Sequence, residues 1–380
     1  MNASRNLLSH CTLKPEAAPG SIAVDDHSMI EQARISIHDW NADVATAHNE
    51  LAQQVENSCQ QLLPAGVSRD SLSDETARLV DRYSTADSLA LHLQSRLRNL
   101  SKTVILFALC GIIGFELSHW LGQQDGHVYH FLAKVALTCF VAAWCIAIFL
   151  ARRSHHVRLQ ERCQDYRALA EGLRVQFYWH WAGLKNNAFQ AYPKRQRDEL
   201  LWIRFALEQW APATESSSSD AKTVLSAWIE DQSEYFVGKD GRSGAIQENG
   251  QLNALFRNRG RLFLLTGVTL GGVAAAVVWF GKLLFQEHVV HQMEGFITTA
   301  AGLSLVGAAA CYAWKERFAY AENFRNYSSM ARIYEEARAR LEEKTLSSEA
   351  ILLELGEEAI AESTEWRLLH RERHATEARL

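Results

Sequence analysis

The stretch "YHFLAKVALTCFVAAWCIAIFLA", residues 129–151, decides the fold class. It is apolar almost throughout, and its one formal charge, on Lys134, lies near one end. About 20 apolar residues are enough for a helix to cross the hydrocarbon core of a bilayer. A lysine near the end of such a helix can extend its amine to the polar interface. We therefore expect a transmembrane helix over residues 129–151.

Three further runs have the same character. They are "TVILFALCGIIGFELSHW" (103–120), "RLFLLTGVTLGGVAAAVVWFGKLLF" (261–285) and "GFITTAAGLSLVGAAACYAW" (295–314). The first is the shortest, and it contains Glu116. Together with residues 129–151, these runs predict four transmembrane helices arranged as two hairpins.

Basic residues flank the runs on one side only. They are Arg96, Arg98 and Lys102 before the first run, Arg152, Arg153 and Arg158 after the second, Arg257, Arg259 and Arg261 before the third, and Lys315, Arg317 and Arg325 after the fourth. The loops inside the hairpins, 121–128 and 286–294, contain no lysine or arginine. Because basic loops stay in the cytoplasm, we expect both chain ends and the segment between the hairpins there.

The two hairpins also resemble each other. The segment from Arg98 to Trp120 parallels the segment from Arg257 to Trp279, with a basic entry before the apolar run. After each hairpin a helix with a tyrosine follows, at "DYRALAEGLRVQF" and "NYSSMARIYEEAR". This order predicts an internal duplication.

Outside the membrane, "YRALAEGLRVQFYWHW" (166–181) is the most informative segment. Leu173 and Phe177 belong to one helical stripe, while Trp179 lies on a second apolar face and Trp181 adds a further ring. A helix that is apolar on two sides needs two neighbours, so we expect it inside a cytoplasmic helical bundle. The alternative is a stacking platform for a base, although no phosphate-binding loop adjoins it.

The expected architecture is therefore an all-α membrane protein with four transmembrane helices and long cytoplasmic helices. Its expected segments are an N-terminal polar and helical part (1–72), a first helix–hairpin–helix repeat (73–190), a helical connector (191–250), a second repeat (251–345) and a C-terminal helix (346–380). The few prolines, five in 380 residues, agree with a helical chain.

Small residues inside the runs indicate close helix packing. Gly267 and Gly271 form a GxxxG pattern, and Ala300, Ser304 and Ala308 repeat a small residue every four positions. These faces fit packing within the chain or packing between protomers of a homo-oligomer. Glu116 is an ionisable group within or at the rim of a run, and such residues often face a water-filled path. Snorkelling to the interface is the alternative for Glu116.

No enzyme is expected. Phosphate-binding, nucleophile-elbow and zinc-protease motifs are absent, and the seven cysteines form no CxxC pair, so no cofactor, metal or disulfide framework is predicted. The outer loops hold histidines and carboxylates that fit solvated residues better than a metal or proton site: Asp125, His127, His130, Glu287, His288, His291 and Glu294. The net charge of −5 argues against a nucleic-acid partner.

Four segments carry a resemblance to a known family. They are "DRYSTADSLALHLQSRLRNL" (81–100), "YRALAEGLRVQFYWHW" (166–181), "AWIEDQSEYF" (227–236) and "LGEEAIAESTEWRLLHRER" (355–373). With the hairpins between them, they resemble the bacterial SLATT domains, which are two-transmembrane effector modules of SMODS- and SLOG-associated conflict systems. The likeness covers roughly residues 75–375.

The resemblance implies a pore-forming or membrane-disrupting effector of an anti-phage system in the bacterial inner membrane. Such effectors are often fused to a nucleotide-sensing domain, but the first 70 residues here lack a phosphate loop. We therefore expect the sensor to be a separate partner, or this chain to be the membrane part of a longer one. A non-conducting membrane scaffold and a small ion channel or transporter are the alternative functions.

Overall fold

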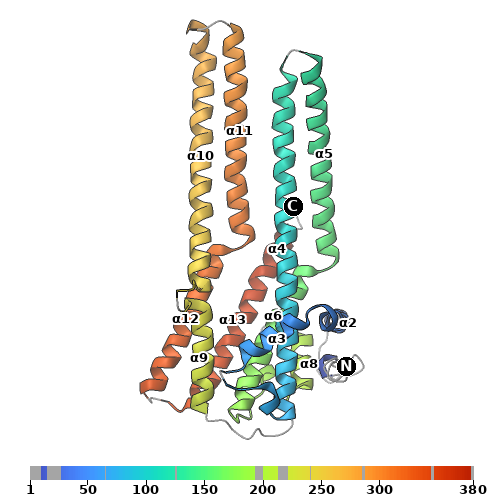
Figure 1. Cartoon of the computed structure of the whole chain (residues 1–380), viewed down its shortest axis with the longest axis vertical. Helices are drawn as coiled ribbons and strands as arrows, with labels where there is room; N and C mark the ends of the chain where they lie inside the picture. Colours follow the sequence, from blue (N-terminus) through green and yellow to red (C-terminus); the bar gives the residue numbers. More distant parts are fainter. Residues whose placement is uncertain are drawn as a thin grey trace. The chain divides into compact units, whose positions relative to one another are not determined.

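The structure is a computed structural model that describes residues 10–14, 27–64, 66–124, 126–192, 200–212, 221–239, 241–284, 287–343 and 346–377. Within these ranges the chain consists of helices, turns and short loops, without a strand (Figure 1). The prediction of an all-α chain is confirmed. The helices are α2 (His27–Glu50), α3 (Ala52–Leu62), η2 (Arg69–Ser71), α4 (Asp74–Gly122), α5 (His127–His156), α6 (Leu159–Trp181), α7 (Ala188–Ala191), α8 (Leu201–Gln209), α9 (Ala221–Val237), α10 (Ala245–Leu284), α11 (Glu287–Arg317), α12 (Tyr320–Glu343) and α13 (Ser348–Glu377).

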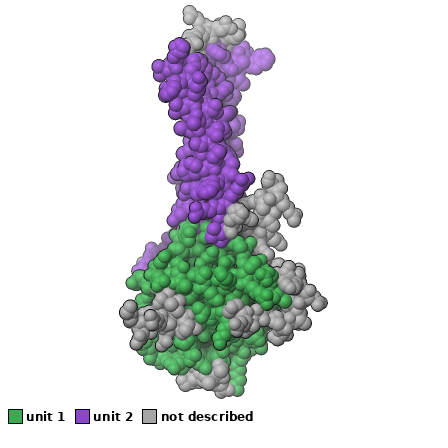
Figure 2. All heavy atoms as spheres, turned by 90° about the vertical axis from the view of Figure 1, so that its right-hand side faces the viewer, with its two compact units in different colours: residues 1–96, 158–240, 328–380 green, residues 97–157, 241–327 purple. Residues whose placement is uncertain are grey.

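The chain divides into two compact units, coloured separately in Figure 2. Unit 1 comprises residues 1–96, 158–240 and 328–380, and unit 2 comprises residues 97–157 and 241–327. The five segments expected from the sequence stay predictions. The structure groups residues by contact, so each unit draws on segments that are far apart in the chain.

Unit 2 contains the apolar helix segments. Four helices are long and apolar enough to cross a membrane, and only 11 to 17% of the most apolar stretch of each is buried inside the molecule. Phe131, Leu265 and Trp279 are 65%, 66% and 79% exposed. Water would disfavour so much apolar surface by ~25 cal/mol per Å². Four such helices are consistent with a membrane protein, as the sequence predicts.

In each hairpin of unit 2, the two helices come into close contact at a glycine. In the second hairpin, a Cβ atom placed on Gly267 would lie 2.8 Å from the Leu305 side chain and 3.2 Å from the Ala301 carbonyl oxygen. In the first, a Cβ atom on Gly111 would lie 2.7 Å from the ring of Trp144. Because glycine has no Cβ, the backbones of the paired helices can approach closely at these positions.

In unit 1, α6 is the central helix. Leu173 and Phe177 are fully buried, and Trp179 is 1% exposed, while Trp181 is half-buried and stacks on Phe177 with ring centroids 5.6 Å apart. The helices α7, α8, α9 and α13 all contact α6. The two apolar faces of this helix are therefore covered by other parts of the same chain.

The contact between α6 and α13 depends on one glycine. The Trp179 indole lies so close to Gly356 of α13 that a Cβ atom there would be 2.6 Å from the ring. The indole nitrogen also donates a hydrogen bond to the Leu352 carbonyl oxygen at 3.0 Å. The ring is thus held against α13 by packing and by a hydrogen bond.

Candidate functional site

The candidate site is the contact between α4 of the first hairpin and α11 of the second. We call it the hairpin seam and define it by Ser101, Glu116 and Gln123 of α4 and Gly295, Gly302 and Arg317 of α11. A Cβ atom on Gly302 would lie 3.4 Å from Glu116 Oε1, and one on Gly295 would lie 3.1 Å from Gln123 Oε1. At the other end, Arg317 Nε donates a hydrogen bond to Ser101 Oγ at 3.2 Å.

These three contacts share one register. Glu116 lies opposite Gly302, and Gln123, seven residues later on α4, lies opposite Gly295, seven residues earlier on α11. Likewise Ser101, fifteen residues before Glu116 on α4, lies opposite Arg317, fifteen residues after Gly302 on α11. Seven residues are close to two helical turns, so each set lies on one face of its helix. The hairpin seam is therefore a continuous antiparallel contact between the first and last predicted spans.

Glu116 is the ionisable group of this seam. It lies fourteen residues after Lys102 and six before the end of α4, which corresponds to about 21 Å and about 9 Å along the helix axis. Its side chain is half-buried and has no hydrogen-bond or ion-pair partner among the residues that the structure describes. A charged carboxylate inside a bilayer is costly unless water or a cation reaches it.

Gly302 explains how the carboxylate fits between the helices. A methyl group at this position would be in ordinary van der Waals contact with Glu116, since the distances to the carboxylate atoms are 3.4 to 3.5 Å. Any larger side chain would take the space that the carboxylate occupies. The seam therefore accepts alanine at residue 302 but not a branched residue, if Glu116 is to stay where it is.

The predicted small-residue positions divide into two groups. Gly267 packs against α11, Ala308 is 3% exposed, and Ser304 donates a hydrogen bond to the Ala300 carbonyl oxygen at 2.8 Å. A Cβ atom on Gly271, in contrast, would meet nothing within 4 Å. The two glycines of the GxxxG pattern therefore do not share a neighbour within the described chain.

Sequence reasoning missed Gly295 and Gly302. The signal was present, because two glycines seven residues apart in the fourth run match two polar residues that are also seven apart, Glu116 in the first run and Gln123 just after it. A search for four-residue spacing does not detect this pattern. Only a comparison between runs far apart in the chain would have found it.

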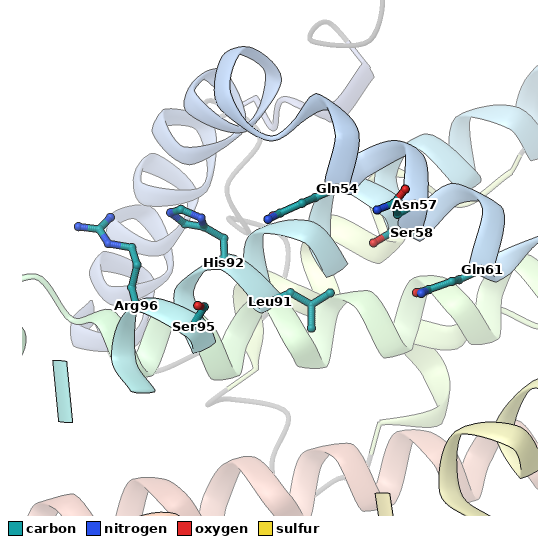
Figure 3. A pocket seen from close by; sticks show the side chains of 8 residues that line it. All are labelled: Gln54, Asn57, Ser58, Gln61, Leu91, His92, Ser95 and Arg96. Atoms are coloured by element: carbon teal, nitrogen blue, oxygen red, sulfur yellow. The ribbon is translucent and has the colours of Figure 1, made fainter. Parts of the chain in front are cut away.

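Unit 1 contains a polar groove between α3 and α4, with a volume of about 300 Å³ (Figure 3). Its lining consists of Gln54, Asn57, Ser58, Gln61, Leu91, His92, Ser95 and Arg96. Side-chain amides and hydroxyls dominate, and the lining has no carboxylate. The groove can hold water or a small polar molecule, but it lacks the acidic ligands that a hard metal cation requires.

The histidines and carboxylates at the start of α5 and of α11 do not form a metal site in the described part of the chain. No group of three histidine, cysteine or carboxylate side chains lies close enough together there to hold an ion. His291 Nδ1 lies 3.7 Å from Glu294 Oε2 on one exposed turn. Asp125 and the side chains of Glu287 and His288 lie outside the described residues.

One carboxylate of unit 1 makes stability depend on pH. Burial, with the nearby Glu171 and Glu365, raises the pKa of Glu362 from 4.5 to about 7, although Arg167 opposes the shift. A carboxyl group with a raised pKa binds a proton more tightly in the folded state than in the unfolded one. Its effect therefore lowers the free energy of unfolding as pH rises from about 4.5 to about 7.

We expect Glu362→Gln to remove this pH dependence and to stabilise the protein at pH 8 by about 1–2 kcal/mol, because the half-buried charge is gone. Thermal unfolding of the purified full chain in detergent at pH 5 and pH 8 measures the effect. Glu358→Gln, at an exposed position one turn earlier on α13, is the control. Equal shifts for both variants would contradict the assignment to Glu362.

Comparison with protein-family models, with curated proteins and with solved structures gave no match to this chain.

Proposed function

We propose that this protein is a bacterial inner-membrane effector of an anti-phage system. In this proposal it oligomerises and opens a pore, or disrupts the membrane, when a nucleotide-sensing partner signals infection. The single observation that carries the proposal is the half-buried carboxylate of Glu116, unpartnered among the described residues, in the hairpin seam. The likeness of four sequence segments to SLATT domains supports the same function.

The physical argument starts from the cost of the carboxylate. A fold that needed only a membrane anchor would gain nothing from a glutamate within a span, about 9 Å from the end of α4. A fold that admits water or cations along the seam would gain from it, because the charge stabilises a cation in transit. Gly302 keeps room beside the carboxylate, so that an opening movement of the two hairpins would expose Glu116 to water.

The non-conducting scaffold is the weaker alternative. A scaffold that tethers cytoplasmic partners through the aromatic residues of 166–181 would need those side chains at the surface. Leu173, Phe177 and Trp179 are instead buried under helices of the same chain. A scaffold would have to use a different surface.

The test is expression of the full chain in bacterial cells, with membrane potential and entry of a DNA-binding dye as readouts. We expect Glu116→Gln to slow depolarisation at least about tenfold, the change produced by ~1.4 kcal/mol in a barrier. Gly302→Val, which displaces the carboxylate, should act in the same direction, and Gly302→Ala should leave depolarisation unchanged.

Glu248→Gln is the matched control, because Glu248 is an exposed carboxylate of unit 2 at the start of α10. Equal loss in this variant would show that the effect is not specific to Glu116. If the wild-type chain reaches the membrane but leaves the potential intact, with and without its genomic neighbours, the pore proposal fails and the scaffold becomes the better explanation.

A further inference from the structure

The three arginines before the third run, Arg257, Arg259 and Arg261, form a compact group of positive charge on α10. We call them the α10 arginines. All three are exposed, and the structure gives none of them a hydrogen bond or ion pair within the described residues. No acidic residue lies between Glu248 and Glu287 in the sequence.

Some other guanidinium groups of the chain pair with carboxylates. In unit 1, Arg69 lies 2.5 Å from Asp81, Arg174 lies 3.0 Å from Glu171, and Arg340 lies 2.8 Å from Glu354. In unit 2, Lys315 lies 3.0 Å from Glu316. Other exposed arginines beside the apolar runs, such as Arg98 and Arg152, likewise make no ion pair within the described residues. The α10 arginines differ from these in forming a group of three within five residues. Exposed cations without an ion pair are available to an external anion.

The helix geometry directs these side chains outward. Gly260, between Arg259 and Arg261, is buried against Tyr312 and Cys311 of α11. At about 100° per residue, Arg257 and Arg261 lie on one flank of this contact and Arg259 on the other. All three guanidinium groups can then reach the surroundings on either side of α11.

The position of the arginines along the apolar helices indicates which kind of anion can reach them. The contacts of Gly260 and Gly267 place Arg261 level with residues 309–310 of α11. That level is about eight residues, or about 12 Å, from Arg317 towards the apolar end of α11. The neighbours of Arg261 along α10, Leu262 and Leu265, are 65% and 66% exposed. An unpaired guanidinium in such surroundings needs an anion that a bilayer itself supplies.

We propose that the α10 arginines bind the phosphate groups of anionic lipids. A guanidinium donates paired hydrogen bonds to phosphate oxygens, and a lipid with net negative charge also satisfies the local excess of positive charge. Arg257 and Arg261, one turn apart, hold a headgroup on one flank, and Arg259 holds another on the opposite flank. This lipid site does not depend on whether the protein conducts.

The test is native mass spectrometry of the full chain in detergent, titrated with short-chain phosphatidylglycerol or phosphatidylcholine. We expect the wild type to bind phosphatidylglycerol at least about tenfold more tightly, and less so in high salt. The triple variant R257Q/R259Q/R261Q should lose about 100-fold of this affinity, because about fivefold for each of the three arginines multiplies to roughly that factor. Replacement of the same residues by lysine should retain most of it.

The control is R332Q/R338Q, which removes two exposed arginines of α12 that belong to unit 1 and make no hydrogen bond or ion pair within the described residues. Their loss should leave phosphatidylglycerol binding unchanged. Equal affinity for both lipids, or equal losses in the triple variant and the control, would overturn the proposal. Competition by millimolar inorganic phosphate would show a free-phosphate site instead of a lipid site.

Discussion

Truncation of Trp179 to alanine should destabilise unit 1 by about 3–5 kcal/mol, the usual cost of deleting a large buried aromatic side chain. The ring is 1% exposed, fills the space over Gly356 and donates its indole N–H to the Leu352 carbonyl oxygen. Removal of the ring leaves a cavity and removes the hydrogen bond of the indole to Leu352. Denaturant or thermal unfolding of the purified full chain in detergent measures the loss.

The same contact can be tested from the opposite helix. Gly356→Ala adds a methyl group that would lie 2.6 Å from the ring, so we expect a loss of about 1–3 kcal/mol from overpacking. Helix propensity alone would predict a gain of up to about 1 kcal/mol, because alanine is favoured over glycine in a helix. A net loss would therefore report the clash with the ring. Glu357→Ala, at an exposed neighbouring position, is the control and should be nearly neutral.

The double variant distinguishes a specific contact from a general weakening. Once the Trp179 ring is gone, the added methyl group has room. The double variant should therefore lose less stability than the sum of the losses in the two single variants. Strict additivity would mean that the two positions do not interact. In that case the close approach of α6 and α13 would not exist in solution.

The second large effect concerns the two glycines of the GxxxG pattern. Gly267→Ile should weaken the second hairpin by about 2 kcal/mol or more, because the Cβ atom alone would lie 2.8 Å from Leu305 and 3.2 Å from a backbone oxygen. Gly271→Ile should change the stability of a single chain by less than about 0.5 kcal/mol, since nothing lies within 4 Å. Unfolding in mixed detergent micelles measures both.

The pair also tests how copies of the chain associate. If the face that carries Gly271 packs against another protomer, Gly271→Ile should abolish oligomers in membrane cross-linking and should abolish toxicity, while the chain stays folded. If both properties survive, protomers associate through another face. A hairpin that tolerates Gly267→Ile would contradict the packing of α10 on α11 described above.

The fold class could be predicted from the sequence because transmembrane helices are a local property. The four apolar runs correspond to four helices long and apolar enough to span a membrane, and residues 166–181 form a helix buried on both sides. The grouping into units could not be predicted in the same way. Unit 1 joins residues 1–96, 158–240 and 328–380, and such contacts depend on side-chain fit between distant segments.

In the candidate site, too, only some of the residues could be predicted from the sequence. Glu116 could be selected from the sequence because an ionisable side chain in an apolar run is unusual. Its neighbour Gly302 could not, since the runs contain many glycines and only the register of α4 against α11 singles this one out. Gly271 illustrates the opposite error, because a motif match at four-residue spacing does not tell which glycine has a neighbour.

The hairpin seam has a consequence for the order in which the protein is made. Glu116 and Gly302 are separated by 186 residues, so the seam cannot close until the last span has been synthesised. At about 5–20 residues per second, Glu116 waits about 10–40 s in the nascent chain before its neighbour emerges. During that interval the carboxylate is near the membrane without Gly302 beside it. A ribosome stalled between the hairpins would therefore leave an inserted first hairpin whose charged group has no seam to enter.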